Sequence, residues 1–398
     1  MNFRDLPGVA KWIEQFAMPD QYLAEFALQK FRYVGFQEFE EWIQGSVVRL
    51  VEEIETNDHG RSAIALFPVQ KPPGAIFGAP RESKQTNDSA GRVAHALKNI
   101  ERVLPKHVEL TPRLESMRAR RVRHIVFVDD FVGTGDRFIS YWRTSVARSV
   151  KSWCSRGWTK IWFLTFAGHA EGIAKIVRTV KPAVRERIRI NVEIERNYWK
   201  EAGEVHGLFG RYGFRVGRRR GAFGYGDLLS PVIFQHGCPN NASELLWLSA
   251  RKSLTNWKPL FPNRSVPKAL YPLFTGDVAL EATPEQLWIV GHYEIALNMI
   301  ERIDDFREHH RLVLALALID SGKDLESVKG VFLLSEEEFK KFVSVIRSSG
   351  LIGEGGKLSS FGRELLARAG RYKRRKRVRG GDYEFFYPST FLGFQRSI

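Results

Sequence analysis

The hydrophobic positions divide the chain into a helical beginning and a middle in which strands and helices alternate. Between residues 8 and 56, apolar side chains recur every three or four positions, the spacing that places them on one face of a helix. Farther along, helical patterns separate short strand-like segments at residues 62–69, 124–128, 160–168 and 188–194. This alternation predicts an α/β fold with a mostly parallel sheet and an N-terminal helical layer packed on it. Ligands of such sheets bind at the carboxyl ends of the strands.

A pair of carboxylates and a glycine loop follow the run at 124–128. Asp129 and Asp130 come first, and Gly133-Thr134-Gly135 then leads into a segment compatible with a helix. Loop glycines let backbone N–H groups converge on an anion, and the helix N-terminus adds a favourable dipole. The carboxylates repel that anion but suit hydroxyl groups or a metal. The pattern predicts a ligand such as a ribose 5-phosphate, and an ordinary turn capped by an aspartate is the alternative.

The order of a hydrophobic strand, Asp-Asp, two apolar residues and Gly-Thr-Gly resembles the PRPP loop of type I phosphoribosyltransferases. The resemblance implies that Asp129 and Asp130 are the catalytic residues, which hold the ribose hydroxyls. It also implies Mg²⁺ as the cofactor, contacted by these carboxylates through the ligand. The loop residues that would bind the ribose phosphate are Gly133, Thr134, Gly135, Asp136 and Arg137. The family usually has Thr or Ser at the last of these positions, so a cation replaces a hydroxyl here.

Two segments earlier in the chain are candidates for contacts with the same ligand. Lys71 follows the run at 62–69, where the resembling family has a loop that contacts pyrophosphate. A plain turn of proline and glycine with a solvated lysine is the alternative. Residues 80–92 are polar and rich in turn formers, which suits a mobile lid that excludes water. A surface loop without a catalytic role is equally compatible.

Glycine, aromatic and arginine residues are interleaved between residues 207 and 229. This combination suits a segment that grips phosphates and stacks on bases. Arg218, Arg219 and Arg220 are therefore candidate nucleic-acid contacts. A solvated arginine run on a flexible loop is the alternative.

A second resemblance begins at residue 226, where a strand pattern leads into His236-x-x-Pro-Asn240-Asn241 and then a helix with Leu-Trp. This order resembles the phosphoribosyltransferase-like domains of bacterial conflict and antiphage systems, and the likeness extends over residues 10–260. His236, Asn240 and Asn241 are candidates to hydrogen-bond a base or ribose edge. A turn in which the asparagines serve only as caps is the alternative.

The last part of the chain resembles a winged helix-turn-helix over residues 305–370. Helical patterns at 285–302 and 309–320 precede the recognition-helix candidate Ser335–Arg347, which opens with a capping-box sequence. Two apolar runs around Gly355-Gly356 predict a β-hairpin wing. The helix candidate begins with acidic residues, so docking to a protein competes with reading a DNA sequence.

These patterns predict five parts of the chain. They are a helical layer at 1–60, a phosphoribosyltransferase-like α/β domain at 61–255, a linker or strap at 256–284, a winged-helix-like domain at 285–370 and a basic, aromatic tail at 371–398. Cations in the tail are candidate contacts to the phosphates of nucleic acid, namely Lys373, Arg374, Arg375, Lys376 and Arg377. A solvated basic tail is the alternative.

The composition narrows the partners and the compartment. Lys and Arg number 61 against 45 Asp and Glu, and the net charge of +16 favours polyanionic partners such as nucleic acid without identifying one. Cys154 and Cys238 are too few for a disulfide scaffold, which fits a reducing cytoplasm. No apolar run has transmembrane length and the first residues lack the apolar core of a signal peptide, so we expect no membrane partner.

Three functions compete at this point. The resemblance implies an enzyme that binds PRPP or a nucleotide and acts at the anomeric carbon, as an effector of a bacterial antiphage system. In retrons, such an effector is held inactive by a reverse transcriptase with its RNA–DNA product, which would then be a partner. The alternatives are a non-catalytic nucleotide sensor and a DNA-binding regulator that uses the α/β part only as a scaffold.

Overall fold

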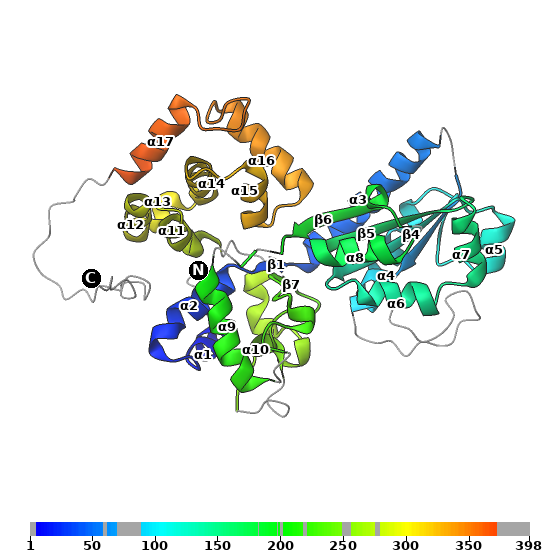
Figure 1. Cartoon of the computed structure of the whole chain (residues 1–398), viewed down its shortest axis with the longest axis horizontal. Coiled ribbons are helices and arrows are strands. Elements are labelled where there is room, and N and C mark those ends of the chain that lie inside the picture. Colours follow the sequence, from blue (N-terminus) through cyan, green and yellow to red (C-terminus); the bar gives the residue numbers. More distant parts are fainter. Residues whose placement is uncertain are drawn as a thin grey trace, which may run out of the picture.

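A five-stranded parallel sheet forms the right-hand part of the molecule in Figure 1. The computed structural model describes residues 5–58, 62–69, 89–181, 183–196, 198–199, 202–217, 221–248, 256–274 and 279–371. The strand order is β3-β2-β4-β5-β6, and every neighbouring pair is parallel. The strands are β2 (Ile64–Pro68), β3 (Val108–Leu110), β4 (His124–Val132), β5 (Lys160–His169) and β6 (Ile188–Ile194). The predicted α/β fold with a mostly parallel sheet is confirmed.

Helices cover both faces of this sheet. Successive side chains of each strand point to opposite faces, and in β4 both sets are apolar and need to be covered. Val126 and Val128 of β4 pack with α3 (Phe36–Asn57) and α4 (Ser89–Ile100). Ile125 and Phe127 pack on the other face, with a second set of helices. These are α5 (Leu114–Ala119), α6 (Asp136–Thr144), α7 (Arg148–Ser155) and α8 (Ala170–Thr179). All nine residues of β4 are buried, as expected of a central parallel strand.

The helix-compatible segment after the glycine loop is two helices in the structure. The chain leaves helical geometry after Thr144 and starts α7 at Arg148. The carbonyl oxygen of Tyr141 accepts hydrogen bonds from both Ser145 and Val146, which closes the first helix. The bend lets Val146 and Val150 both reach the core.

A second core lies beside the sheet and gathers segments distant in sequence. Its elements are α1 (Pro7–Ile13), α2 (Met18–Gln29), β1 (Arg32–Val34), α9 (Gly203–Val216), β7 (Val232–Phe234) and α10 (Glu244–Trp247). The strands β1 and β7 form a parallel pair of their own. Trp12 of α1 packs against Trp257, and Phe16, which follows α1, packs against Tyr212 and Trp257. Within the described part of the predicted N-terminal helical layer, residues 5–58, α3 packs on the five-stranded sheet, whereas α1 and α2 belong to the second core.

The glycine-rich segment predicted to grip phosphates is helical over most of its first half. The helix α9 contains Gly207, Gly210 and Gly213 and ends at Val216. A Cβ at Gly213 would lie 2.6 Å from the Cα of Ala222, so this glycine allows two backbones to approach closely. Its glycines therefore serve packing rather than flexibility. Arg218, Arg219 and Arg220 lie outside the described residues.

The C-terminal part is a helical domain with the predicted winged helix-turn-helix elements. Its helices are α11 (Ala279–Ile289), α12 (Tyr293–Glu301), α13 (Ile303–Phe306), α14 (His310–Asp320), α15 (Leu325–Phe332), α16 (Glu336–Ser348) and α17 (Ser360–Gly370). Ser335 and Glu338 form the predicted capping box at the start of α16. The wing is reduced to one antiparallel bridge between Ile352 and Leu358. The pattern at 285–302 is broken at Gly291, whose φ is +87°.

Short 3₁₀ helices connect several of these elements. They span Glu101–Val103, Arg185–Arg187, Tyr225–Asp227, Pro262–Arg264 and Lys268–Phe274. Among the described residues, no helix combines the length and the apolar character needed to cross a bilayer.

Candidate functional site

A cavity of 440 Å³ opens at the carboxyl end of β4. Four segments of the chain line it: the end of β4 with the start of α6, Tyr225, the turn after β7, and residues 263–265. The structure brings together these predicted residues: Asp129, Asp130, Gly133, Thr134, Gly135, Asp136, Arg137, His236, Asn240 and Asn241. Its position agrees with the rule that parallel sheets bind ligands beyond the carboxyl ends of their strands.

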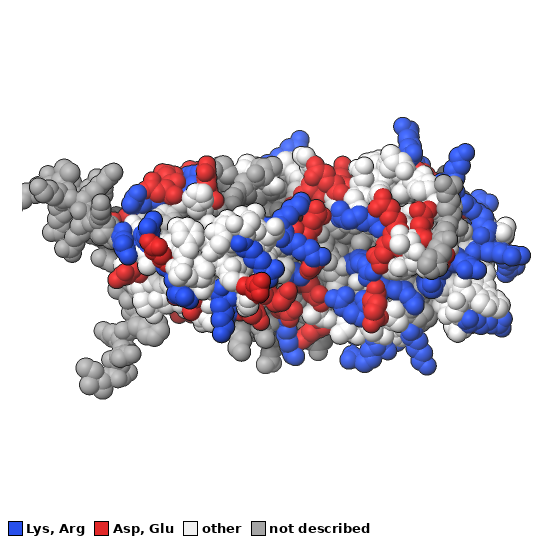
Figure 2. Space-filling view, turned by 90° about the horizontal axis from the view of Figure 1, so that it is seen from above, with Lys and Arg blue, Asp and Glu red and all other residues white. Residues whose placement is uncertain are grey.

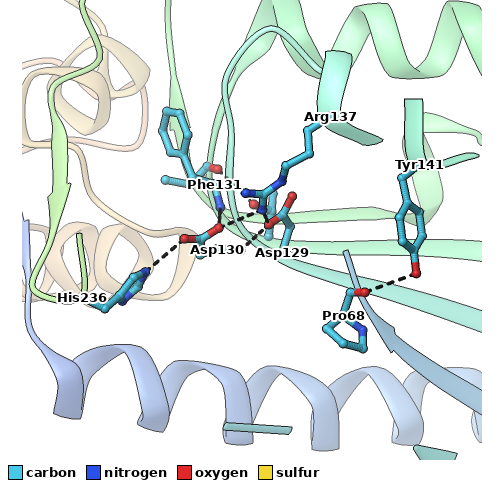
Figure 3. A network of polar contacts seen from close by, with 9 residues as sticks. Pro68, Asp129, Asp130, Phe131, Arg137, Tyr141 and His236 are labelled. Atoms are coloured by element: carbon cyan, nitrogen blue, oxygen red, sulfur yellow. Dashed lines mark hydrogen bonds and ion pairs between the residues drawn. The ribbon is translucent and has the colours of Figure 1, made fainter. Parts of the chain in front are cut away.

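Arg137 connects the two carboxylates (Figure 3). Asp129 and Asp130 are neighbours in a strand, so their side chains leave opposite faces of the sheet. The Nη2 atom of Arg137 nevertheless donates to Oδ1 of Asp129 and, at 3.1 Å, to Oδ1 of Asp130. Both carboxylates are buried, so a cation between them offsets the cost of removing their charges from water. Both carboxylates that the sequence predicts to hold ribose hydroxyls are thus paired with Arg137.

His236 contacts the other oxygen of Asp130. Its Nε2 atom lies 3.0 Å from Oδ2 of Asp130, and its side chain is 2% exposed. The ring stacks on Phe234 with centroids 4.9 Å apart and packs against Phe39 at 5.1 Å. A ring fixed in this way holds the Asp130 carboxylate in one orientation. The histidine arrives from the turn after β7, as the second sequence motif predicted.

The glycines give the loop its close contact with α8. Gly135 has a φ of +78° and forms the N-cap of α6, a conformation that favours glycine. A Cβ on Gly172 of α8 would lie only 1.9 Å from the carbonyl oxygen of Gly133. The loop backbone is therefore clamped between the starts of two helices. The N-terminus of α6, which lines the cavity, favours an anion there.

Asp136 is the acidic member of the loop, and two residues absent from the sequence predictions hold it. Lys175 of α8 donates to Oδ1 of Asp136 at 2.6 Å, while Thr134 at 2.8 Å and Tyr225 at 3.3 Å donate from their hydroxyls to Oδ2. Burial raises the pKa of Asp136, but the hydrogen bonds from Lys175 and Thr134 outweigh this effect and leave the pKa below its ordinary value. The carboxylate is ionised at neutral pH, and Lys175 compensates its charge beside the anion cradle.

The two asparagines of the turn after β7, Asn240 and Asn241, lie in different environments. Asn241 is buried, its amide donates to the carbonyl oxygen of Tyr225 at 2.7 Å, and a Cβ on Gly133 would clash with it. It therefore closes the wall of the cavity by tying Tyr225 to the loop. Asn240 is exposed at the edge of the cavity. Nearby, Arg264 lines the cavity from the segment expected to be a linker, and no local motif marks it or Lys175.

Several candidates cannot be placed against this cavity. Lys71 lies outside the described residues, as does most of the lid candidate; residues 89–92 begin α4. The tail residues Lys373, Arg374, Arg375, Lys376 and Arg377 also lie outside them.

The carboxylates of Asp129 and Asp130 fit a divalent cation that is bound together with a phosphate ligand. Among the described residues, no cluster of three or more His, Cys, Asp or Glu side chains has the arrangement of a metal site. Mg²⁺ keeps several waters and is often bound by one or two carboxylates together with substrate phosphates. Asp129 and Asp130 match that smaller requirement.

The first turn of the recognition-helix candidate faces the α/β part. Glu338 pairs with Arg32 of β1 at 3.1 Å, and Glu337 pairs with Arg49 of α3 at 3.4 Å. Glu336 pairs with Lys329 within its own domain. Helix-turn-helix proteins contact bases with the start of this helix. In this chain the same turn is paired with Arg32 and Arg49, so it joins the two domains instead.

The fold and the site together define a phosphoribosyltransferase-like α/β protein with an appended winged helix. The chain belongs to the PRTase-CE family, whose family model matches residues 9–263. A second family, described as wHTH-PRTase associated, matches residues 313–393. No curated protein and no solved structure matches the chain.

Proposed function

We propose that the chain binds a ligand containing ribose 5-phosphate, such as PRPP, and acts at its anomeric carbon. The observation that carries this proposal is the buried pair Asp129 and Asp130 beside a glycine loop at the N-terminus of α6. Carboxylates accept hydrogen bonds from vicinal hydroxyls, and the loop N–H groups suit the phosphate. A cavity of 440 Å³ lies within the usual size range of sites for small ligands.

Arg137 would change partners when the ligand enters. Ribose hydroxyls donate hydrogen bonds to Asp129 and Asp130 and so replace the guanidinium, which is 28% exposed and can turn out into solvent. His236 would keep Asp130 oriented during this exchange. Lys175 would stay with Asp136, because that contact lies on the side of α8.

Mg²⁺, when bound, supplies charge neutralisation for a pyrophosphate leaving group. Asp129 and Asp130 would hold it together with the ligand. The residues of this chain would orient the ribose and exclude water from the anomeric carbon, where positive charge develops as the leaving group departs. The departure of that group, more than proton transfer, would then limit the rate.

The second family name supports a wider role for the protein. An appended winged helix favours contact with nucleic acid or a regulatory partner. We infer that the chain is the effector of a bacterial antiphage system, with the α/β part as the toxic domain. A retron, with a reverse transcriptase and its RNA–DNA product as partners, is the setting that the sequence resemblance favours.

One observation favours a second candidate function, a non-catalytic nucleotide sensor. Arg137 already compensates the charges of both carboxylates, so the site without ligand is a stable resting state, as a sensor requires. A scaffold for DNA reading alone is less favoured, because the first turn of α16 is engaged with Arg32 and Arg49.

Two measurements on the full chain separate these functions. Calorimetry with PRPP and Mg²⁺ tests binding, and pyrophosphate release with nucleobases or nucleic acids as acceptors tests turnover. The double variant Asp129→Asn with Asp130→Asn should lose binding while staying folded, whereas the exposed Asp304→Asn should behave as the wild type. Binding without release supports the sensor, and unchanged binding by the double variant excludes this site.

A further inference from the structure

A basic and aromatic surface lies at the amino ends of the strands, whereas the candidate site lies at their carboxyl ends. It surrounds a cavity of 520 Å³ at the amino ends of β4 and β5, and we call it the basic edge. The surface is defined by six residues: Arg118, Arg121, Arg123, Arg156, Trp158 and Lys160. Figure 2 shows Lys and Arg side chains gathered at the right-hand end of the molecule, where Figure 1 places α5 and α7.

Parallel pairing explains why these residues meet. His124 of β4 pairs with Lys160 of β5, so the residues that precede both strands come together at one edge. Arg123 directly precedes β4, and its carbonyl oxygen accepts a hydrogen bond from the backbone of Lys160 at 2.7 Å. The turn after α7 brings Trp158 to the same place, held by a hydrogen bond from its backbone N–H to the carbonyl oxygen of Trp153 at 3.0 Å.

The positive charges of the basic edge are largely uncompensated. Within the described part of the chain, Arg118, Arg121, Arg123 and Arg156 are all exposed, and none makes an ion pair with a carboxylate. The nearest acid in the cavity wall is Asp58, whose oxygens are engaged by His124 at 2.7 Å and Lys160 at 3.0 Å. An anion would thus find guanidinium groups without competing partners.

Trp158 indicates what kind of anion fits. Its side chain is 59% exposed at the rim of the cavity, although an indole of this size is usually buried. Arg156 lies over the ring, with Cζ 4.9 Å from the centroid. Arginines near helix C-termini also stabilise the helix dipole, which accounts for some of the charge here. That effect does not account for an exposed indole beside a cavity.

We propose that the basic edge binds single-stranded nucleic acid, with a base stacked at Trp158 and phosphates held by Arg121 and Arg123. An aromatic ring beside unpaired arginines is the combination that single-strand binding uses. Bases of a duplex are stacked on one another and do not reach an indole at a cavity rim. An acidic protein would use the charges but has no need of the indole and its cavity.

Arg121 offers a variant that separates binding from folding. Its φ is +53°, a left-handed conformation that favours glycine over arginine. Arg121→Gly therefore removes a cation and should not unfold the protein. Arg123→Ala removes the second cation from an exposed position. Lys11→Ala with Arg215→Ala is the matched control, because it removes two exposed cations from α1 and α9.

Fluorescence anisotropy of the full chain with labelled oligonucleotides of about 20 residues, single-stranded and duplex, tests the proposal. Arg121→Gly with Arg123→Ala should reduce the slope of log K against log salt by about 1.4 for single strands. Trp158→Ala should weaken single-strand binding about tenfold without changing that slope. The control variant should leave affinity and slope as in the wild type.

Three results would overturn the proposal. They are a full chain that binds no single strand, a salt slope that the double variant does not alter, and a loss in Trp158→Ala that is equal for duplex and single strand. An unaltered slope would mean that nucleic acid does not contact the basic edge, and an acidic protein would then be the better candidate for its partner. A melting temperature of the double variant at or above that of the wild type shows that a loss of binding is not a loss of fold.

Discussion

The guanidinium of Arg32 and the carboxylate of Glu338 meet in two parallel hydrogen bonds. Nη1 lies 3.1 Å from Oε2 and Nη2 lies 3.1 Å from Oε1. This two-point geometry is the strongest arrangement that an arginine and a carboxylate adopt. Arg32 is in β1 of the α/β part and Glu338 is in the first turn of α16, so the pair joins the two domains. Arg32 also donates to Glu38 at 2.6 Å and to the carbonyl oxygen of Leu333.

Arg32→Ala should loosen the contact between the domains. We expect the free energy of unfolding to fall by on the order of 2 kcal/mol, because several hydrogen bonds to a charged group are lost together. Amide hydrogen exchange in the first turns of α16 should accelerate. Arg49→Ala is the control, since its pair with Glu337 is exposed on both sides and should contribute well under about 1 kcal/mol. Unchanged exchange in α16 would contradict this role of Arg32.

Arg137→Ser tests whether the arginine competes with the ligand. Without ligand, the variant should lose on the order of 2 kcal/mol of stability, because two buried carboxylates lose their cation. PRPP with Mg²⁺ should bind about tenfold more tightly, since no ion pair has to break first. Thermal unfolding with and without ligand measures both effects. Weaker binding would instead show that Arg137 itself contacts the ligand, and Arg137→Lys separates its charge from its two-point geometry.

Gly172→Ala should disturb the glycine loop at residues 133–135, which α8 contacts directly. Its new methyl group would meet the carbonyl oxygen of Gly133, so either the loop or α8 has to move. We expect a loss of about 2 kcal/mol in stability together with weaker ligand binding. Gly330→Ala in α15 is the matched control, because apart from the adjacent backbone of its own helix no atom lies within 4 Å of its new methyl group. That control should gain about 0.5–1 kcal/mol, as measured by urea unfolding.

His169 should make the protein less stable in mild acid. It is 3% exposed at the end of β5, and burial lowers its pKa to about 4. Its ring is neutral in the folded chain but gains a proton in the unfolded chain below about pH 6.5, so stability is full above that pH and is lost as the pH falls toward 4. The loss between pH 7 and pH 5 should be about 2 kcal/mol.

Urea unfolding at the two pH values checks this prediction. His169→Leu should remove this part of the pH dependence, whereas the exposed His95→Gln should keep it. An equal loss in wild type and His169→Leu would assign the acid sensitivity to other groups.

Sequence patterns located the long buried strands because their apolar residues either follow one another without a break or alternate with polar residues. The run at 160–168 became β5 with one additional residue, and the run at 188–194 became β6 with the same bounds. Strand β1 was not predicted. Its three residues are too few to show a period, and Phe31 before it continues the helical spacing of α2.

The candidate site shows a similar limit. Motif order predicted the loop and the approach of His236, since both follow strands of one fold. The contact between Arg137 and the carboxylates was not predictable, because it depends on the left-handed Gly135 that starts α6 and turns the first helical residues back toward β4. Lys175 and Tyr225 reach Asp136 across 39 and 89 positions, with no local pattern to mark them.

One strand separates the two surfaces that we propose bind ligands. Arg123 precedes β4 and Asp129 lies six positions later, so an extended backbone puts about 20 Å between them. A nucleotide stacked at Trp158 therefore cannot present its own sugar to Asp129. Nucleic acid at the basic edge would act as an anchor that keeps the protein at one location, while the reactive ribose belongs to a different molecule or to a distant part of the same strand.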